Sequence, residues 1–383
     1  MRYRTLGKTG IEVSALSFGC MRLPLAENAG ANPAPDAPID EETATRMIRY
    51  AMENGINYFD TAYPYHGGKS EALLGKALKP DREKVMVATK LPSWLIEKPA
   101  DFEKFLDEQL ERLDTNYIDF YLLHGLNRTF WENIEPKGAL EFLDKIQKDG
   151  RARQVGFSFH DGPSFFKEVV DSYDWALCQI QYNYFDENNQ AGREGLEYAT
   201  AKGLGIVIME PLRGGKLVGK IPDNIQSIWE SAQTKRTPVE WAFEWVWNHP
   251  EVSTVLSGMS DMAQLVENVT IANRAAPNAF SADDLNRVQQ VKEAYQAMIK
   301  VDCTACRYCM PCPNNVAISS CFSLYNDVYL FDNLTVSKNM YNMMLEPKTR
   351  ADNCNECGEC EEKCPQKIEI IDALKDVHQV LGS

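Results

Sequence analysis

The sequence predicts an α/β protein in which a (β/α)8 barrel, preceded by a short hairpin, is followed by a small cysteine-rich domain. From about residue 15 to about residue 272, short runs of β-branched residues alternate with amphipathic helical stretches. Eight such units in about 250 residues agree with the repeat number and length of a (β/α)8 barrel. By contrast, eight of the eleven cysteines lie in two tight runs near the C-terminal end, which indicates a second domain with different chemistry.

The barrel strands are predicted from short apolar runs, which are typical of parallel strands buried on both faces. They are Ala15–Cys20, Tyr58–Ala62, Val85–Lys90, Ile118–His124, Gln154–Phe159, Leu177–Tyr182, Gly205–Glu210 and Thr254–Gly258. Helical patterns fall between them, among them Glu41–Asn54, Asp101–Arg112, Gly138–Lys148, Ala191–Lys202 and Pro238–Asn248. A doubly wound sheet is the competing arrangement, but no G-x-G-x-x-G follows the first strand.

Two flanking segments complete the predicted architecture. Tyr3–Val13, with its two glycines, predicts a hairpin that closes the bottom of the barrel. Ser281–Lys300 predicts a helix that begins with a Ser281/Asp284 capping pair and leads into the cysteine domain, which ends in a short helix near Glu369–Leu381. The predicted domains are therefore the barrel, residues 1–280, and the linker helix with the cysteine domain, residues 281–383.

The overall charge and hydropathy exclude several classes of partner. A formal net charge of −15 and a pI near 4.9 argue against nucleic acid and against anionic membranes. No apolar stretch is long enough to span a bilayer, and the first residues have no apolar core of a signal peptide. We therefore expect a cytoplasmic protein without a membrane partner.

The cysteines form two tight runs with regular spacing. The first is Cys303-x2-Cys306-x2-Cys309-x2-Cys312-Pro313, and the second is Cys354-x2-Cys357-x2-Cys360-x3-Cys364-Pro365. Two-cluster ferredoxins hold 4Fe–4S clusters in this way, three thiolates from one run and the fourth, before a proline, from the other. Zinc sites more often use separated pairs or histidine, and disulfides are rare in a reducing compartment. The spacing predicts two 4Fe–4S clusters in a ferredoxin-like domain.

The same ferredoxin pattern predicts a crossed set of ligands. One cluster would take Cys303, Cys306, Cys309 and Cys364, and the other Cys354, Cys357, Cys360 and Cys312. The first run is one residue short before its last cysteine, so Cys321 is an alternative to Cys312.

Four polar residues lie where three successive barrel strands end. Asp60, Lys90 and His124 close the second, third and fourth predicted strands, and Tyr65 follows Asp60 by five residues. Barrel enzymes place their catalytic groups at this end of the strands. Each residue alone has an ordinary structural explanation, but four of these types at one barrel mouth indicate a catalytic site.

The residues around this set resemble a known family. The segments Asn57-Tyr-Phe-Asp-Thr-Ala-Tyr-Pro-Tyr65, Ala-Thr-Lys90 and Tyr-Leu-Leu-His124 resemble the catalytic motifs of the aldo-keto reductases, and the resemblance extends over residues 3 to 272. The cysteine domain resembles that of a branch with a C-terminal ferredoxin-like module. This resemblance implies an oxidoreductase that reduces a small carbonyl, or oxidises an alcohol, with NADH or NADPH.

The chemistry of the four residues agrees with that activity. Hydride addition to a carbonyl leaves an alkoxide, which Tyr65 would protonate as general acid. The Lys90 ammonium should lower the pKa of Tyr65, and Asp60 should keep Lys90 charged and in place. His124 would donate a hydrogen bond to the substrate oxygen.

The resemblance also implies where the nicotinamide cofactor binds. Ser158 and Gln179 would hold the carboxamide, Met209 replaces the stacking aromatic residue, Gly214, Gly215 and Lys216 would receive the pyrophosphate, and Glu267 and Asn268 would bind the adenosine. Gly258 and Gln264 occupy positions that usually carry basic residues for the 2′-phosphate of NADPH, and Phe159 replaces a second polar contact to the carboxamide. We expect weakened discrimination in favour of NADPH.

Residues in the loops after the strands are candidates for substrate contact. Trp94, Phe130 and Trp131 follow the third and fourth strands, and Met21 and Arg22 follow the first. Anchoring of the loops is an equally good explanation for such aromatic residues.

How the two domains share electrons is left open by the sequence. A nicotinamide passes two electrons as hydride, whereas a 4Fe–4S cluster passes one. A flavin is possible, but no flavin motif is visible. The clusters could be structural, or could feed single electrons into a substrate or flavin at the barrel mouth, with Tyr65 as proton donor. A ferredoxin or flavoprotein is a possible electron partner. The alternative function is a ferredoxin-like electron-transfer or redox-sensing subunit whose barrel is not a carbonyl reductase.

Overall fold

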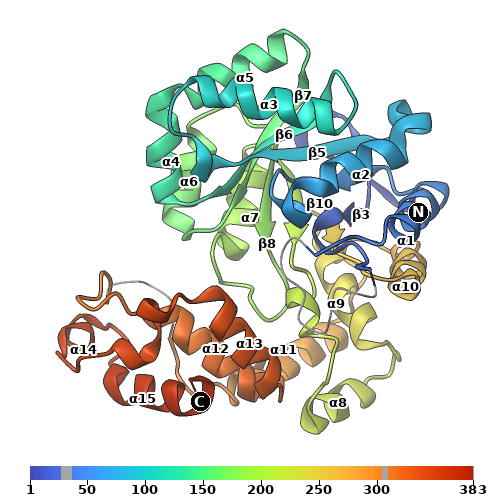
Figure 1. Ribbon diagram of the computed structural model, residues 1–383. Helices are drawn as coiled ribbons and strands as arrows, with labels where there is room; N and C mark the ends of the chain where they lie inside the picture. The colour runs from blue at the N-terminus through green and yellow to red at the C-terminus, as the bar shows by residue number, and fades with distance from the viewer. Residues whose placement is uncertain (27–36, 304–308, 383) are drawn as a thin grey trace. The chain divides into compact units, whose positions relative to one another are not determined.

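A closed barrel of eight parallel strands forms the core of the larger part of the chain (Figure 1). The computed structural model describes residues 1–26, 37–303 and 309–382. The barrel strands are β3 (Leu16–Gly19), β4 (Tyr58–Asp60), β5 (Met86–Leu91), β6 (Ile118–Leu126), β7 (Ala152–Phe159), β8 (Leu177–Gln181), β9 (Gly205–Met209) and β10 (Val252–Ser257). They pair in chain order, and β10 closes the ring against β3. All eight predicted strands are confirmed, and the doubly wound sheet is excluded.

The predicted N-terminal hairpin is also confirmed. Strand β1 (Tyr3–Thr5) pairs antiparallel with β2 (Glu12–Ser14), and Leu6 between them is fully buried among residues of the barrel interior. The backbone N–H of Lys8 donates to the carbonyl of Gly203, just before β9 begins. The hairpin therefore closes the barrel at the N-terminal ends of its strands.

Helices surround the barrel on the outside (Figure 1). They are α1 (Glu41–Glu53), α2 (Lys69–Leu78), α3 (Ala100–Arg112), α4 (Arg128–Ile134), α5 (Ala139–Lys148), α6 (Pro163–Asp171), α7 (Gly192–Ala201), α9 (Pro238–Trp247) and α10 (Met262–Ala272). Each of the longer helices buries one apolar stripe. In α1 that stripe is Ala44, Met47, Ile48 and Ala51, the spacing of one helix face.

The chain divides into two compact units. The first contains Met1–Gly214 and Val239–Phe280, and the second contains Gly215–Pro238 and Ser281–Ser383. The predicted boundary at residue 280 recurs, but the segment 215–238 with α8 (Asp223–Glu230) joins the second unit. It is held there by Arg236, which forms a 2.6 Å ion pair with Asp284. Asp284 also completes the predicted capping box of α11 (Ala282–Gln296).

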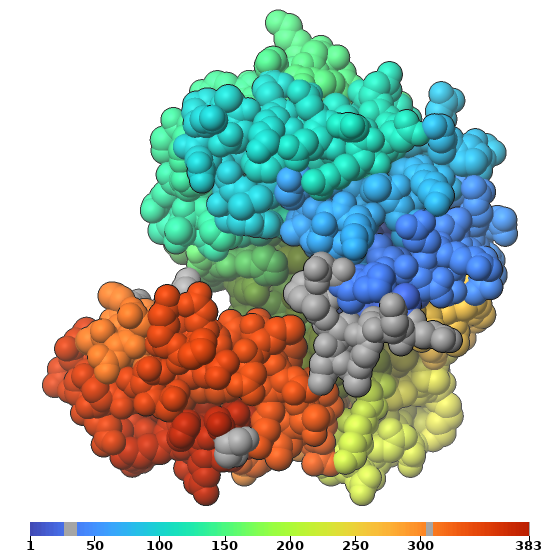
Figure 2. Space-filling model, viewed as in Figure 1, coloured from blue at the N-terminus to red at the C-terminus, as the bar shows by residue number. Residues whose placement is uncertain are grey.

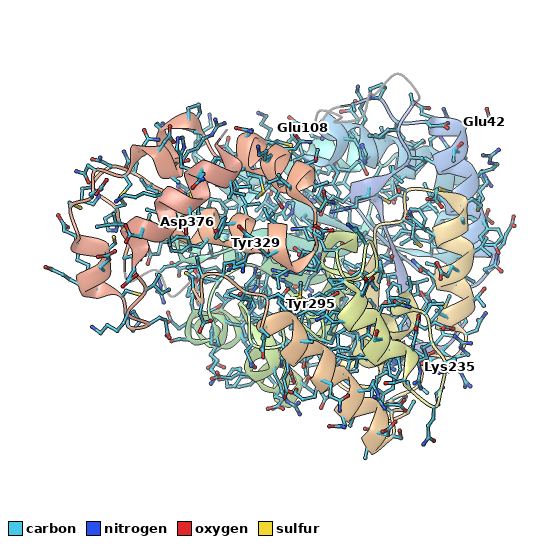
Figure 3. The ribbon with its side chains drawn as sticks, turned by 90° about the horizontal axis from the view of Figure 1, so that it is seen from below. Glu42, Glu108, Lys235, Tyr295, Tyr329 and Asp376 are labelled. Atoms are coloured by element: carbon cyan, nitrogen blue, oxygen red, sulfur yellow. The ribbon has the colours of Figure 1, made fainter. Side chains whose placement is uncertain are left out.

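The second unit has its own apolar core, formed by residues between Val301 and Leu381. The surface of this part of the chain is coloured orange to red in Figure 2. It is built from α12 (Ile318–Leu330), α13 (Leu334–Met344), α14 (Glu359–Lys363) and α15 (Ile370–Leu381). Tyr295 of α11, labelled in Figure 3, lies with its ring 5.9 Å from that of Phe331, which follows α12. The terminal helix was expected near residues 369–381, whereas α12 and α13, between the two cysteine runs, were not. No helix among the described residues has the length and apolar character needed to cross a membrane.

Candidate functional site

A buried ion pair joins the ends of two neighbouring barrel strands. Lys90 Nζ donates to Asp60 Oδ1 at 2.6 Å and to the carbonyl oxygen of Thr61 at 2.8 Å. The two side chains are 0% and 4% exposed. Because β4 and β5 are adjacent and parallel, their C-terminal ends lie side by side, which brings together residues 30 positions apart in the sequence.

Tyr65 and His124 complete the predicted set beside this pair. The ammonium of Lys90 lies 5.2 Å from the centre of the Tyr65 ring, and the Tyr65 and His124 rings lie 6.0 Å apart. The residue after Tyr65 has a left-handed backbone (φ +52° at His66), and its imidazole Nε2 accepts a 3.2 Å hydrogen bond from the N–H of Leu23. The structure therefore brings together all four predicted catalytic side chains.

The electrostatics of the pair keep Lys90 charged. Burial opposes the charge of Lys90, but the Asp60 carboxylate and Tyr65 outweigh it and raise the pKa of Lys90 above its usual value. Burial raises the pKa of Asp60, and the neighbouring Lys90 opposes that rise. A fixed cation therefore lies beside the phenol.

The pKa of Tyr65 differs from the expectation. Burial raises this pKa by more than Lys90, as expected, lowers it, so the net direction is upward. The phenol consequently keeps its proton at neutral pH, the state that a general acid needs. Burial, with a smaller contribution from Lys90, holds the pKa of His124 well below its usual value. The His124 imidazole is therefore neutral, and its Nδ1 is buried without a hydrogen-bond partner among the described residues.

The strand ends on the far side of the barrel mouth carry the residues expected to hold a carboxamide. Gln179 of β8 has a buried Oε1 without a hydrogen-bond partner among the described residues, while its Nε2 lies 3.8 Å from the sulfur of Met209. Ser158 Oγ accepts a 2.7 Å hydrogen bond from the N–H of Gly125. Phe159 is buried in the aromatic core. The free acceptor of Gln179 fits the amide N–H of a nicotinamide.

The two residues expected to bind the adenosine lie on different sides of helix α10. Asn268 of α10 is buried and donates a 3.1 Å hydrogen bond to Ser257 Oγ at the end of β10, whereas Glu267 is exposed. Gln264 lies in the first turn of α10, where its N–H donates to the capping carboxylate of Asp261. Neither Gly258 nor Gln264 supplies a positive charge.

The glycine loop after β9 has the open backbone expected of a phosphate-binding loop. Gly214 and Gly215 have φ values of +67° and +91°, and a Cβ on Gly215 would meet no atom within 4 Å. Lys216, in the second unit, pairs with the buried carboxylate of Asp327 on α12. Its charge is thus already matched by a protein carboxylate.

The cysteines of the second unit surround its apolar core. Of the eight predicted ligands, Cys306 lies outside the described residues. Those that are buried in the core or packed against it are Cys303, Cys309, Cys312, Cys354, Cys360 and Cys364, whereas Cys357 is exposed. No disulfide joins any of the described cysteines. The described residues contain no group of three or more donors near enough for one metal ion, but a 4Fe–4S cluster spreads its thiolates more widely than a single ion does.

Comparison with known proteins agrees with both halves of this description. Residues 15–293 match the sequence model of the Aldo/keto reductase family, and residues 302–369 match that of the 4Fe-4S dicluster domain. The chain belongs to the aldo/keto reductase family. It is an oxidoreductase that carries a C-terminal iron–sulfur domain.

Relatives of this aldo/keto reductase cover mainly the barrel. An L-galactose dehydrogenase of Arabidopsis thaliana is 29% identical over 76% of this chain and 94% of its own length. An uncharacterised oxidoreductase of Bacillus subtilis is 26% identical over 78% of this chain and 100% of its own. Among solved structures, an aldo-keto reductase of Bacillus halodurans in its holo form is 28% identical, with a TM-score of 0.63 over 76% of this chain and 96% of its own.

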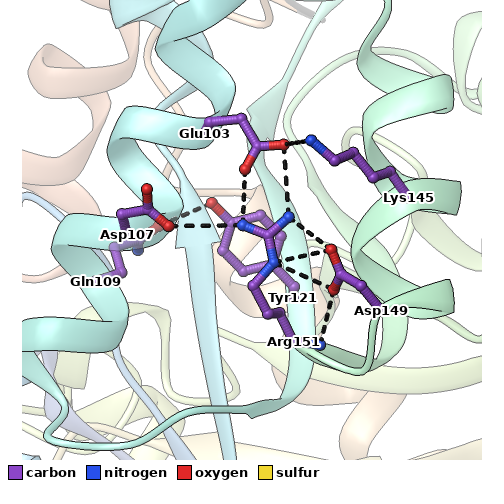
Figure 4. A network of polar contacts seen from close by, with 7 residues as sticks. All are labelled: Glu103, Asp107, Gln109, Tyr121, Lys145, Asp149 and Arg151. Carbon is purple, nitrogen blue, oxygen red and sulfur yellow. Dashed lines mark hydrogen bonds and ion pairs between the residues drawn. The ribbon is translucent and has the colours of Figure 1, made fainter.

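A buried polar network behind Lys90 was not predicted from the sequence. Gln109 of α3 donates from Nε2 to the carbonyl oxygen of Lys90 at 3.1 Å and to Glu71 Oε1 at 2.7 Å. Thr89 Oγ1 also donates to Glu71 Oε1, at 2.6 Å, and Tyr121 donates to Gln109 Oε1 at 2.8 Å (Figure 4). Glu71 and Gln109 are fully buried. The network fixes the backbone from which Lys90 projects.

The sequence did contain a signal for this network. Glu71 precedes Leu74 by three residues and Gln109 follows Phe105 by four, so both fall on the apolar faces of their helices. A polar residue on a buried face needs a partner, and two on neighbouring helices can supply each other.

Aromatic residues line the space next to His124 in this reductase. The Trp94 ring lies 5.1 Å from that of His124 and 6.0 Å from that of Phe130. Trp94 is 39% exposed, so part of its surface faces solvent. The loops after β5 and β6 thus provide an apolar wall next to His124.

Proposed function

We propose that the barrel reduces a small carbonyl compound, or oxidises the corresponding alcohol, with Tyr65 as general acid or base. The observation that carries this proposal is the buried Lys90–Asp60 pair beside the protonated Tyr65 phenol and the neutral His124 imidazole. A bound nicotinamide would supply or accept the hydride. Ser158 and Gln179 would hold its carboxamide, Met209 would lie against its ring, and Glu267 and Asn268 would hold the adenosine.

The four side chains have separate tasks in this proposal. His124 orients the carbonyl oxygen by donating a hydrogen bond from its neutral ring, and Tyr65 delivers a proton to the same oxygen as negative charge develops there. Lys90 stabilises the phenolate that remains, and Asp60 holds Lys90 in its charged form. The network of Glu71 and Gln109 keeps Lys90 at its position.

We propose that NADH and NADPH both bind, without strong preference for NADPH. Gly258 and Gln264 offer no cation to a 2′-phosphate, so the 2′-phosphate of NADPH adds little to the binding energy there. Gly214, Gly215 and Lys216 remain the proposed pyrophosphate loop, with Lys216 also paired with Asp327. The cysteine ligation is the crossed set, with Cys312 as the last ligand of its run, because Cys312 stands directly before a proline, as the last cysteine of a ferredoxin run does.

The electron path and the compartment are further parts of the proposal. The clusters would exchange single electrons with a ferredoxin or flavoprotein partner, or stabilise their domain. We propose the cytoplasm as the compartment, because the described cysteines form no disulfide and iron–sulfur ligands must stay reduced. The intact catalytic set is the argument against a barrel that only supports electron transfer or redox sensing.

The test is an anaerobic activity assay on the full chain with its clusters in place. Small aldehydes, ketones and sugars would be offered with NADH or NADPH; sugars are included because one relative is an L-galactose dehydrogenase. Carbonyl-dependent oxidation of the nucleotide is expected. A protein that binds nucleotide but reduces no carbonyl in the panel would leave the electron-transfer alternative.

A further inference from the structure

One arginine connects the two loops that the proposed nucleotide site needs. Arg22 follows β3, and its Nη1 donates a 3.2 Å hydrogen bond to the carbonyl oxygen of Gly214. The stem of the same side chain lies against Gly258, after β10. A Cβ on Gly258 would come within 3.3 Å of Arg22 Cδ and within 3.4 Å of its Cβ and Cγ. The arginine therefore spans from the end of β10 to the glycine loop after β9.

The absence of side chains on both glycines allows this placement. A Cβ on Gly214 would lie 3.1 Å from Arg22 Nη2, and Gly214 has a φ of +67°, which few other residues adopt. At Gly258 a Cβ would occupy the space that the arginine stem fills. The two glycines thus form a cradle for the Arg22 side chain, Gly258 for its stem and Gly214 for its guanidinium group.

Arg22 also differs from the cations that lie in the glycine loop or next to it in the sequence. Arg213 pairs with Asp186, Lys216 with Asp327 and Lys220 with Asp332. Among the described residues, Arg22 has no carboxylate partner, and its guanidinium donates only to the Gly214 carbonyl. A guanidinium has five N–H donors, so most of them remain available to a ligand.

We propose that Arg22 is a phosphate-binding residue that grips the pyrophosphate of the nicotinamide nucleotide at Gly214. The inference rests on the proposed function, because it assumes that the barrel binds such a nucleotide. The planar guanidinium presents paired N–H donors that fit the oxygens of a doubly charged diphosphate. Arginine is the side chain that best matches this geometry. Arg22 supplies positive charge at the pyrophosphate, where the charge of Lys216 is already matched by Asp327.

This assignment predicts which part of the nucleotide Arg22 recognises. The guanidinium lies at Gly214, whereas only the apolar stem lies at Gly258. The contact is therefore to the pyrophosphate, which NADH and NADPH share, and not to the 2′-phosphate, which only NADPH carries. Loss of Arg22 should weaken both nucleotides to the same extent.

The experiment is calorimetric titration of the full chain, with its clusters in place, by NADH and by NADPH. Arg22→Gln should weaken both nucleotides by about tenfold or more, the usual scale of a charged hydrogen bond. Arg22→Lys should recover part of the loss. Arg49→Gln, which removes an exposed arginine of α1, is the matched control and should bind as the wild type does.

A double-mutant cycle tests the cradle itself. Gly258→Ala should push the Arg22 stem aside and weaken NADH binding in the wild-type background, but it should add nothing to Arg22→Gln. Unchanged affinity of Arg22→Gln for both nucleotides, or a loss confined to NADPH, would overturn the inference while leaving the proposed function intact. A wild-type protein that binds neither nucleotide would refute the proposed function itself, and this inference with it.

Discussion

The Lys90 ammonium lies 2.6 Å from the Asp60 carboxylate, and the two side chains are enclosed by protein at the mouth of the barrel. A buried pair of this kind adds little stability compared with a well-packed apolar pair, because each charge has lost its water. Its value is chemical, since it holds one positive charge beside the Tyr65 phenol. The predictions below follow from this relationship and from the groups that support it.

Removal of the Asp60 charge should lower both the stability of the barrel and its turnover. Asp60→Asn leaves the Lys90 ammonium buried without its counter-ion, which typically costs about 3–5 kcal/mol. The free energy of unfolding, measured with urea, should fall by that order, and turnover should fall with it. The control is Glu41→Gln, which breaks the exposed 3.1 Å pair with Lys76 and should cost less than about 1 kcal/mol. Equal costs for the two variants would contradict the account.

Gln109 should act through Lys90 rather than on substrate. Gln109→Leu keeps the size of the side chain but removes the hydrogen bonds to Glu71 and to the Lys90 carbonyl, at a cost of about 1–3 kcal/mol. We expect a lower kcat and an unchanged affinity for nucleotide. Gln109→Glu, which can still accept from Tyr121 but cannot donate to Lys90, should share the defect in kcat. A change in KM alone would argue against a positioning role.

Stability should decline as the pH falls below neutrality. Burial lowers the pKa of His66, His124, His160 and His249, so the folded chain resists protonation where the unfolded chain, with histidine pKa values near 6.5, takes protons up. The stability these groups contribute is present above about pH 6.5 and is lost as the pH falls toward their folded pKa values, by at most about 1.4 kcal/mol per pH unit for each proton. Urea unfolding between pH 7.5 and 5 should show this slope.

The contribution of His124 can be isolated by substitution. His124→Asn should reduce the pH dependence of the free energy of unfolding between pH 7.5 and 5, because the variant lacks one histidine that resists protonation in the folded chain. A slope equal to that of the wild type would show that the His124 imidazole is not held neutral by burial.

The last cysteine of the first run should decide whether the chain holds one cluster or two. Cys312→Ser should lower the iron content from about eight atoms per chain to about four, because one cluster loses its fourth thiolate. Cys321→Ala should keep both clusters, since Cys321 lies outside the two cysteine runs and is not followed by a proline. Iron analysis and the electron paramagnetic resonance of the reduced protein measure both outcomes. If Cys321→Ala lost a cluster and Cys312→Ser did not, Cys321 rather than Cys312 would be the fourth ligand.

The parts of the site that follow a local pattern could be predicted from the sequence. Asp60 and Lys90 close strands whose apolar runs are visible, and a closed parallel barrel brings strand ends together whatever the details of packing. The pKa of Tyr65 could not be predicted, because its direction depends on how completely the surrounding chain excludes water, and burial outweighs Lys90. The pairing of Lys216 with Asp327 was equally hidden, since more than a hundred residues separate the two.

The central claim is that Tyr65 moves the proton, and Tyr65→Phe tests it most directly. The variant keeps the ring beside Lys90 and His124 but has no hydroxyl. We expect carbonyl reduction in a single turnover to slow by about 10²–10⁴-fold, the usual contribution of a general acid, while the dissociation constant of NADH stays within about twofold. Turnover near that of the wild type, with nucleotide bound, would contradict the account.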